Sequence, residues 1–263
     1  MPDAGEFYVG YLKTPGRLAR FLVMAAVCLL AGAWAVAWGL AKSQNDPGSG
    51  VWHDTPDGLV GRLSASPYPM LRRSTHRPDA PVESILLVSE GKHGPGQPIA
   101  AMDGRTVSIR GTILERDGRR LLELDSDSAV TPMEVDGGAA AADSAASVGA
   151  PTAASMGRVT LRGEIIDPKC YSGAMKPGEG KAHKECATLC IAGGIPPMFV
   201  TLDAKGRKRY YLLTDAAGHG LRGDALSDGV LPFVADDVEI TGDVEQHDDL
   251  TLLKIGPHAI RRR

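Results

Sequence analysis

Three cysteines and one histidine lie close together in a segment that is otherwise rich in glycine, proline and lysine. Residues 170–190 read CYSGAMKPGEGKAHKECATLC, and the fourth cysteine of the chain, Cys28, lies far upstream. Thiolates and imidazole bind Zn²⁺ and Cu(I), and thiols also exchange electrons through disulfides. The segment therefore predicts a metal site, a redox-active disulfide or a loop held by a structural disulfide.

The spacing of these residues predicts that they share one surface. Residues 181–191 are good helix formers, and the glycines and prolines after them are typical of a helix end. On this helix His183, Cys186 and Cys190 occupy positions i, i+3 and i+7, which lie on one face. Cys170 follows an expected strand, and the glycine-rich turn after it can fold its thiol over that face. We therefore predict a site for zinc or copper formed by Cys170, His183, Cys186 and Cys190.

Three further residues are candidate ligands or contacts of this site. The thioether of Met175 would favour copper, because soft ligands select Cu(I), although methionine is also a common gap filler. Tyr171, next to Cys170, can pack over the site or donate a hydrogen bond. His219 lies in a His-Gly pair typical of a turn, and an internal repeat, described below, can bring it near the cluster.

The acidic residues around the cluster have two interpretations. Asp167, Glu179 and Glu185 could orient His183 or stabilise a bound cation. Charged side chains in loops are more often solvated, and we expect these three to be exposed to solvent.

A disulfide is the alternative to a metal. Cys186 and Cys190 are one helical turn apart, and a bond between them would distort the helix. A bond from Cys170 to either of them is easier and would leave the third thiol free, with His183 able to lower its pKa. The chain has no Cys-x-x-Cys motif. A structural disulfide and a redox-active one both stay open beside the metal site.

The cluster resembles a motif found in a group of bacterial membrane-anchored proteins. That motif is CYxGxMxPGxGxxH followed by CAxxCIxGGIPP, and residues 163–200 carry the likeness. The resemblance implies an OB-like domain with an inserted C…HxxCxxxC motif that acts as one unit. It implies no activity.

An apolar segment near the N-terminus predicts a membrane anchor. Residues 21–41 carry no charge and are long enough to cross a bilayer as a helix. Lys13, Arg17 and Arg20 precede this segment and only Lys42 follows closely, which favours a cytoplasmic N-terminus. A cleaved signal peptide is the alternative, but the long polar lead and the length of the apolar run favour a retained anchor. We expect a single-pass protein of the bacterial inner membrane with its C-terminal domains in the periplasm.

The soluble part contains two similar halves. The stretch SILLVSEGKHG (84–94) matches YYLLTDAAGHG (210–220), and VSIRGTILERDGRRLLEL (107–124) matches VEITGDVEQHDDLTLLKI (238–255). Both halves alternate apolar and polar residues, with turn residues such as Asp117-Gly118 between expected strands. The predicted fold is mainly β: a transmembrane helix followed by two small OB-like antiparallel barrels, the second with the short helical Cys/His insertion.

The predicted segments follow from these patterns. They are a cytoplasmic N-terminal segment (1–20), the transmembrane helix (21–41), a linker (42–58), a first OB-like repeat (59–135), a disordered linker rich in Ala, Gly and Ser (136–157), and a second OB-like repeat with the insertion (158–263).

Composition and motifs narrow the function. The chain has 263 residues, a net charge of -3 and 5% aromatic residues, and neither half interleaves aromatic with basic residues, so we expect no nucleic-acid partner. It has no Ser-His-Asp motif, phosphate loop or paired-carboxylate motif, which favours a binding protein over an enzyme. We predict a membrane-anchored periplasmic metal-binding accessory protein that serves an envelope redox or metalloprotein-assembly system with a membrane or periplasmic protein partner. The alternatives are a thiol–disulfide redox protein and a structural interaction module with a stabilising disulfide.

Overall fold

The structure is a computed structural model that describes most of the chain. The described residues are 14–43, 50–74, 82–96, 99, 101–126, 129–133, 148–149 and 151–263. The first part of the predicted N-terminal segment and much of the two predicted linkers lie outside them. The chain divides into two units, Met1–Asp46 and Pro47–Arg263.

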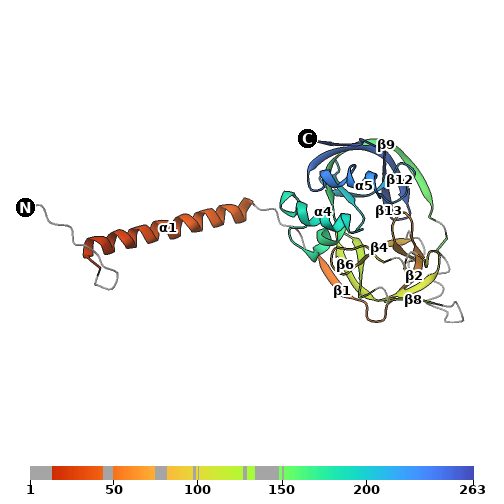
Figure 1. The fold of residues 1–263 in the computed structure, drawn as a ribbon, viewed down its shortest axis with the longest axis horizontal. Coiled ribbons are helices and arrows are strands. Elements are labelled where there is room, and N and C mark those ends of the chain that lie inside the picture. The colour runs from red at the N-terminus through yellow and green to blue at the C-terminus, as the bar shows by residue number, and fades with distance from the viewer. Residues whose placement is uncertain are drawn as a thin grey trace, which may run out of the picture. The chain divides into compact units, whose positions relative to one another are not determined.

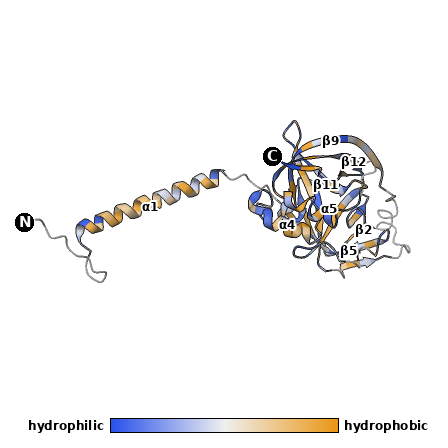
Figure 2. Ribbon diagram, turned by 45° about the horizontal axis from the view of Figure 1, so that its top comes forward, coloured by the Kyte–Doolittle hydropathy of each residue, from blue (hydrophilic) through white to orange (hydrophobic). Residues whose placement is uncertain are grey.

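The first unit contains a long apolar helix, α1 (Gly16–Ser43). Its 28 residues correspond to a length of about 42 Å, and none of its side chains is buried. Figure 2 shows that apolar residues predominate along this helix. The helix is long and apolar enough to cross a membrane, and it extends beyond the predicted span 21–41 at both ends.

The second unit contains two β-sheets, which confirms a mainly β chain (Figure 1). The first sheet has the order β1-β6-β7-β4-β3-β2-β5-β8. All its pairings are antiparallel except that of β4 with β7. Its strands are β1 (Val51–Asp54), β2 (Leu59–Ser64), β3 (Met70–Arg73), β4 (Glu83–Ser89), β5 (Thr106–Ile109), β6 (Gly111–Arg116), β7 (Arg119–Leu124) and β8 (Val130–Pro132).

The hairpin between β6 and β7 forms at the predicted turn. Arg116 pairs with Arg119, and the two residues between them, Asp117 and Gly118, have φ angles of 53° and 73°. Positive φ at both central positions is the type I′ geometry that matches the twist of paired strands. The Asp-Gly pair therefore sets the register that buries Leu121 and Leu122.

The second sheet has the order β13-β11-β10-β9-β12-β14, and β12 also pairs with β13. Only the pairing of β11 with β13 is parallel. Strand β9 begins at Ala153, inside the predicted linker 136–157, and its first six residues are exposed. The strands are β9 (Ala153–Ile166), β10 (Met198–Leu202), β11 (Lys208–Asp215), β12 (Asp237–His247), β13 (Leu250–Ile255) and β14 (Ile260–Arg262).

The Cys/His insertion lies between β9 and β10. It contains one turn of π-helix, η2 (Cys170–Ala174), a short 3₁₀ turn, η3 (Lys181–His183), and the helix α4 (Lys184–Ala192). The helix predicted over 181–191 therefore forms as η3 followed by α4, and α4 ends at Gly193. Two further short helical segments precede β12, α5 (Asp224–Ser227) and η4 (Leu231–Phe233).

The two sheets share a hydrophobic core at the insertion. Each sheet has its own apolar cluster, and a third cluster joins residues of both sheets, including Leu86 and Leu121 of the first and Met198 and Leu212 of the second. The thiols of Cys170 and Cys190 belong to this shared cluster. In Figure 1, α4 lies where the two sheets meet. The predicted site is therefore placed at the junction of the two sheets.

Candidate metal centre

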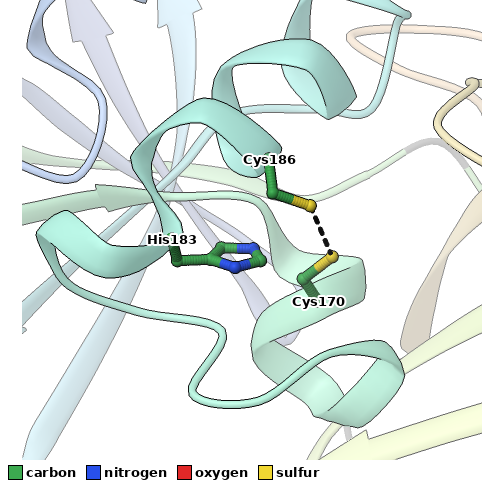
Figure 3. A group of neighbouring side chains, drawn as sticks. All are labelled: Cys170, His183 and Cys186. Carbon is green, nitrogen blue, oxygen red and sulfur yellow. Dashed lines mark hydrogen bonds between the residues drawn. The ribbon is translucent and has the colours of Figure 1, made fainter.

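The predicted ligands come from three consecutive helical segments. Cys170 opens η2 shortly after β9, which ends at Ile166. His183 ends η3, and Cys186 and Cys190 lie on successive turns of α4. The connecting loop can turn back because its glycines at 173, 178 and 180 have φ angles of 126°, 68° and 78°, values that favour residues without a Cβ. Figure 3 shows Cys170, His183 and Cys186 pointing toward one another from these segments.

The ligand atoms form two groups that share one thiol. In the first, atoms of Cys170, His183 and Cys186 lie within 4.8 Å of one another, and the two sulfurs are 3.9 Å apart (Figure 3). In the second, atoms of Asp167, Cys170 and Cys190 also lie within 4.8 Å of one another. The structure therefore brings together the four predicted ligands, which could hold a metal ion, and adds the carboxylate of Asp167.

The cysteines are free thiols in this structure. A disulfide needs an S–S distance of about 2.05 Å, and the sulfurs of Cys170 and Cys186 are 3.9 Å apart. Cys170, His183 and Cys190 are buried, whereas Cys186 is partly exposed. The centre is thus closed on the core side and accessible at Cys186.

Asp167 is not the solvated loop charge that we expected from the sequence. Its side chain is fully buried, and one carboxylate oxygen, Oδ1, accepts hydrogen bonds from the backbone N–H groups of Lys169 and Cys170. The other oxygen, Oδ2, lies 3.8 Å from His183 Nε2, and both atoms are buried without a hydrogen-bond partner. Burial alone would raise the pKa of Asp167, but His183 and the thiols of Cys170 and Cys190 outweigh it and hold the pKa below its usual value.

The other two acidic residues lie apart from the ligand groups. Glu185 is exposed, as expected. Glu179 is only partly exposed, because it forms ion pairs with Arg116 and Lys208 at 3.7 Å and 3.5 Å.

A lysine from the first sheet completes the polar environment of the thiols. Lys92, in the loop after β4, donates a hydrogen bond from Nζ to Cys186 Sγ at 2.7 Å, and this bond raises the pKa of the lysine. The loop is held against the end of α4, where Gly94 N donates to Gly193 O at 3.0 Å. A Cβ on Gly193 would lie 1.9 Å from Lys92 O, so only glycine permits this approach. Sequence analysis missed Lys92, since no local motif marks it.

The pKa values of the two buried thiols, Cys170 and Cys190, are shifted in opposite directions. A hydrogen bond with Cys190 and burial both raise the pKa of Cys170. The same hydrogen bond lowers the pKa of Cys190, and the positive charge of Lys92 acts in the same direction. Cys190 is therefore the buried thiol that ionises first.

The three additional candidates have different positions. Met175 is close to the thiols, because its Sδ accepts a hydrogen bond from Cys186 Sγ at 3.3 Å. Tyr171 stacks under the guanidinium of Arg116, and its hydroxyl accepts a hydrogen bond from Lys208. His219 is exposed beside Asp215 and belongs to neither ligand group of the described residues.

An open pocket leads to the centre. Its volume is about 550 Å³, and its wall includes Cys170, Cys190 and Met175. Lys92 and Trp52 of the first sheet's half also line it. The pocket therefore borders two of the three thiols and the thioether, while the partly exposed Cys186 is not among the residues that line it.

Comparison with known proteins finds no family model, curated protein or solved structure that matches the chain. The argument for function therefore rests on the geometry of the site.

Proposed function

We propose that this is a membrane-anchored metal-binding accessory protein whose metal is held by Cys170, His183, Cys186 and Cys190. The observation that carries the proposal is the convergence of thiol, imidazole and carboxylate atoms in two groups that share Cys170. Metal–sulfur bonds of about 2.3 Å place two sulfurs of a tetrahedral site about 3.8 Å apart. The sulfurs of Cys170 and Cys186 are 3.9 Å apart, which suits a shared metal and not a disulfide.

Two buried atoms without partners support a cation at this place. His183 Nε2 and Asp167 Oδ2 make no hydrogen bond, and buried polar atoms in proteins are nearly always paired. A cation coordinated by the imidazole and balanced by the carboxylate would satisfy both. Asp167 would also offset the positive charge that the metal brings into the core.

The strand pairings support two OB-like barrels derived from a repeat. In each sheet the first three strands of the proposed barrel pair in antiparallel order, β2-β3-β4 and β9-β10-β11, and the third pairs in parallel with a later strand, β7 or β13. Strand β12 pairs with both β9 and β13, so the pairings β9-β10-β11-β13-β12 return to β9. This order supports the five-stranded Greek-key barrel of the OB type as the proposed fold of each sheet.

The helix α1 supports an envelope location. Arg17 and Arg20 lie before its apolar core and Lys42 lies after it. This asymmetry favours a cytoplasmic N-terminus and supports the periplasm as the proposed location of the second unit. In that position the metal centre would serve an envelope redox or metalloprotein-assembly system through a membrane or periplasmic protein partner.

A thiol–disulfide redox protein is the second candidate. The lowered pKa of Cys190 and the partial exposure of Cys186 favour it, because reactive thiols need thiolate character and access. In this alternative Cys170 would pair with one of the two cysteines of α4.

Metal analysis with thiol counting separates the two candidates. The full-length Cys28→Ser protein is purified anaerobically in detergent, its metal content is measured, and its thiols are alkylated before and after chelation. We expect about one metal per chain and three thiols that react only after the chelator is added. Cys186→Ser in the same background should lose most of the metal. A metal-free protein with one disulfide and one reactive thiol would instead establish the redox candidate.

A further inference from the structure

We infer that the metal is Cu(I) and that Met175 is its additional ligand, reached through the pocket beside the thiols. This inference rests on the proposed metal-binding function and names the metal that the same site takes. The sequence alone left the role of Met175 open between a ligand and a gap filler.

The position of Met175 is that of a ligand. Its Sδ lies 3.3 Å from Cys186 Sγ, and the residue is 47% exposed. A gap filler would be buried among apolar side chains, whereas Met175 lies at the wall of the open pocket. A thioether in this position can bind an ion that enters from solvent before or while the thiols bind it.

The set of donor atoms favours copper over zinc. Two sulfurs 3.9 Å apart fit both a tetrahedral and a trigonal metal, since bonds of about 2.3 Å give separations of about 3.8 Å and 4.0 Å. The distance between these two sulfurs therefore does not distinguish Cu(I) from Zn²⁺, whereas the type of ligand does. A cluster of thiolates and a thioether selects Cu(I), whereas thioether is not among the usual ligands of Zn²⁺.

The charges around the pocket suit the entry of a cation. Glu90 and Asp125 line it and are exposed, while the positive charge of Lys169 is paired with Glu123 at 2.9 Å and Lys92 Nζ donates a hydrogen bond to Cys186 Sγ. Exposed carboxylates raise the local concentration of cations. Binding exchanges ligands and releases thiol protons, and it transfers no electron.

The test compares Cu(I) and Zn²⁺ on the full-length protein in detergent under anaerobic conditions. Cu(I) affinity is measured by competition with a chromogenic Cu(I) chelator, and Zn²⁺ affinity with a chromogenic Zn²⁺ chelator. We expect Cu(I) to displace Zn²⁺ at equal concentration. Met175→Leu should weaken Cu(I) binding by about tenfold or more and leave Zn²⁺ binding within about twofold. The matched control is Met156→Leu, at an exposed methionine of β9, which should change neither affinity.

The possible failures are distinguishable. A protein that binds neither metal overturns the proposed function together with this inference. A protein that retains Zn²⁺ against equal Cu(I), or whose Cu(I) affinity is the same in the Met175→Leu and Met156→Leu variants, overturns the inference and leaves a metal-binding function standing. The comparison of the two metals on the wild type needs no variant, and Zn²⁺ binding by Met175→Leu reports that the variant is folded.

Discussion

The buried ammonium of Lys169 gives the sharpest test of how the two sheets are joined. Lys169 follows β9 of the second sheet. Its Nζ nevertheless donates hydrogen bonds to three acceptors that lie in the first sheet or its loops: Ser89 O at 2.9 Å, Gly91 O at 2.7 Å and Glu123 Oε1 at 2.9 Å. The side chains of Lys169 and Glu123 are only 6% and 17% exposed. The perturbation is Lys169→Met, which keeps the apolar stem and removes the charge.

The size of the effect follows from the number of partners. The three protons of the ammonium meet three acceptors, so the substitution removes one buried ion pair and two charge-assisted hydrogen bonds. Removal of one partner from a buried pair costs about 3–5 kcal/mol, because the remaining charge is left without compensation. We expect a loss of about 4 kcal/mol in the free energy of unfolding, which is roughly a thousandfold in the folding equilibrium. Glu123→Gln added to Lys169→Met should recover part of this loss, since it removes the unpaired carboxylate.

The assay is urea unfolding of the full-length protein in detergent, followed by near-ultraviolet circular dichroism. Lys205→Met is the control, because Lys205 is exposed and the same change there should cost less than about 0.5 kcal/mol. Equal stabilities of Lys169→Met and Lys205→Met would refute the reasoning, since the ammonium would then be solvated and the two sheets would not meet as described.

Two further predictions test contacts at the same junction. Tyr68→Phe removes a hydroxyl that donates to Leu213 O at 2.8 Å and accepts from Leu221 N at 2.9 Å, and should cost about 2 kcal/mol at neutral pH. Burial raises the pKa of Tyr68. The contribution of its hydroxyl to the free energy of unfolding is therefore complete below about pH 10 and falls by about 1.4 kcal/mol per pH unit above it. Unfolding curves at pH 8 and pH 11 should show that the difference in stability between wild type and Tyr68→Phe is smaller at pH 11. Gly193→Ala places a Cβ against Lys92 O and should lower the free energy of unfolding, measured in urea, by about 1–3 kcal/mol. Gly256→Ala is the control, because a Cβ at this position meets no other atom and should leave the stability unchanged.

Local patterns in the sequence predicted the parts of the site that depend on local structure. The helix over 181–191 and its glycine end were predicted from residue types, and the helix period placed His183, Cys186 and Cys190 together. The structure divides these ligands between two groups, because a rise of about 1.5 Å per residue places Cys190 one turn, about 6 Å, beyond Cys186. The shared thiol of Cys170 links the two groups.

Contacts between distant segments could not be predicted in this way. Lys92 lies 94 residues before Cys186, and only the docking of the first sheet against α4 brings its ammonium to the thiol. Burial of Asp167 was missed for a related reason, because a residue before a proline in a loop is expected to be solvated, and the side chains beside it, His183 and Cys190, come from later in the chain. Hydrophobic periodicity specifies which side of a strand is buried, and it does not specify which sheet covers it.

The position of the centre at this junction has a thermodynamic consequence. Cys170 and Cys190 belong to the core cluster that both sheets share, and Lys92 of the first sheet contacts Cys186 of the second sheet's insertion. A metal that binds only the assembled site must stabilise the packing of one sheet on the other, by an amount that grows with the logarithm of its free concentration. The first sheet is therefore part of the proposed metal centre, and for the proposed function we expect a partner that receives the metal to contact both sheets at the pocket.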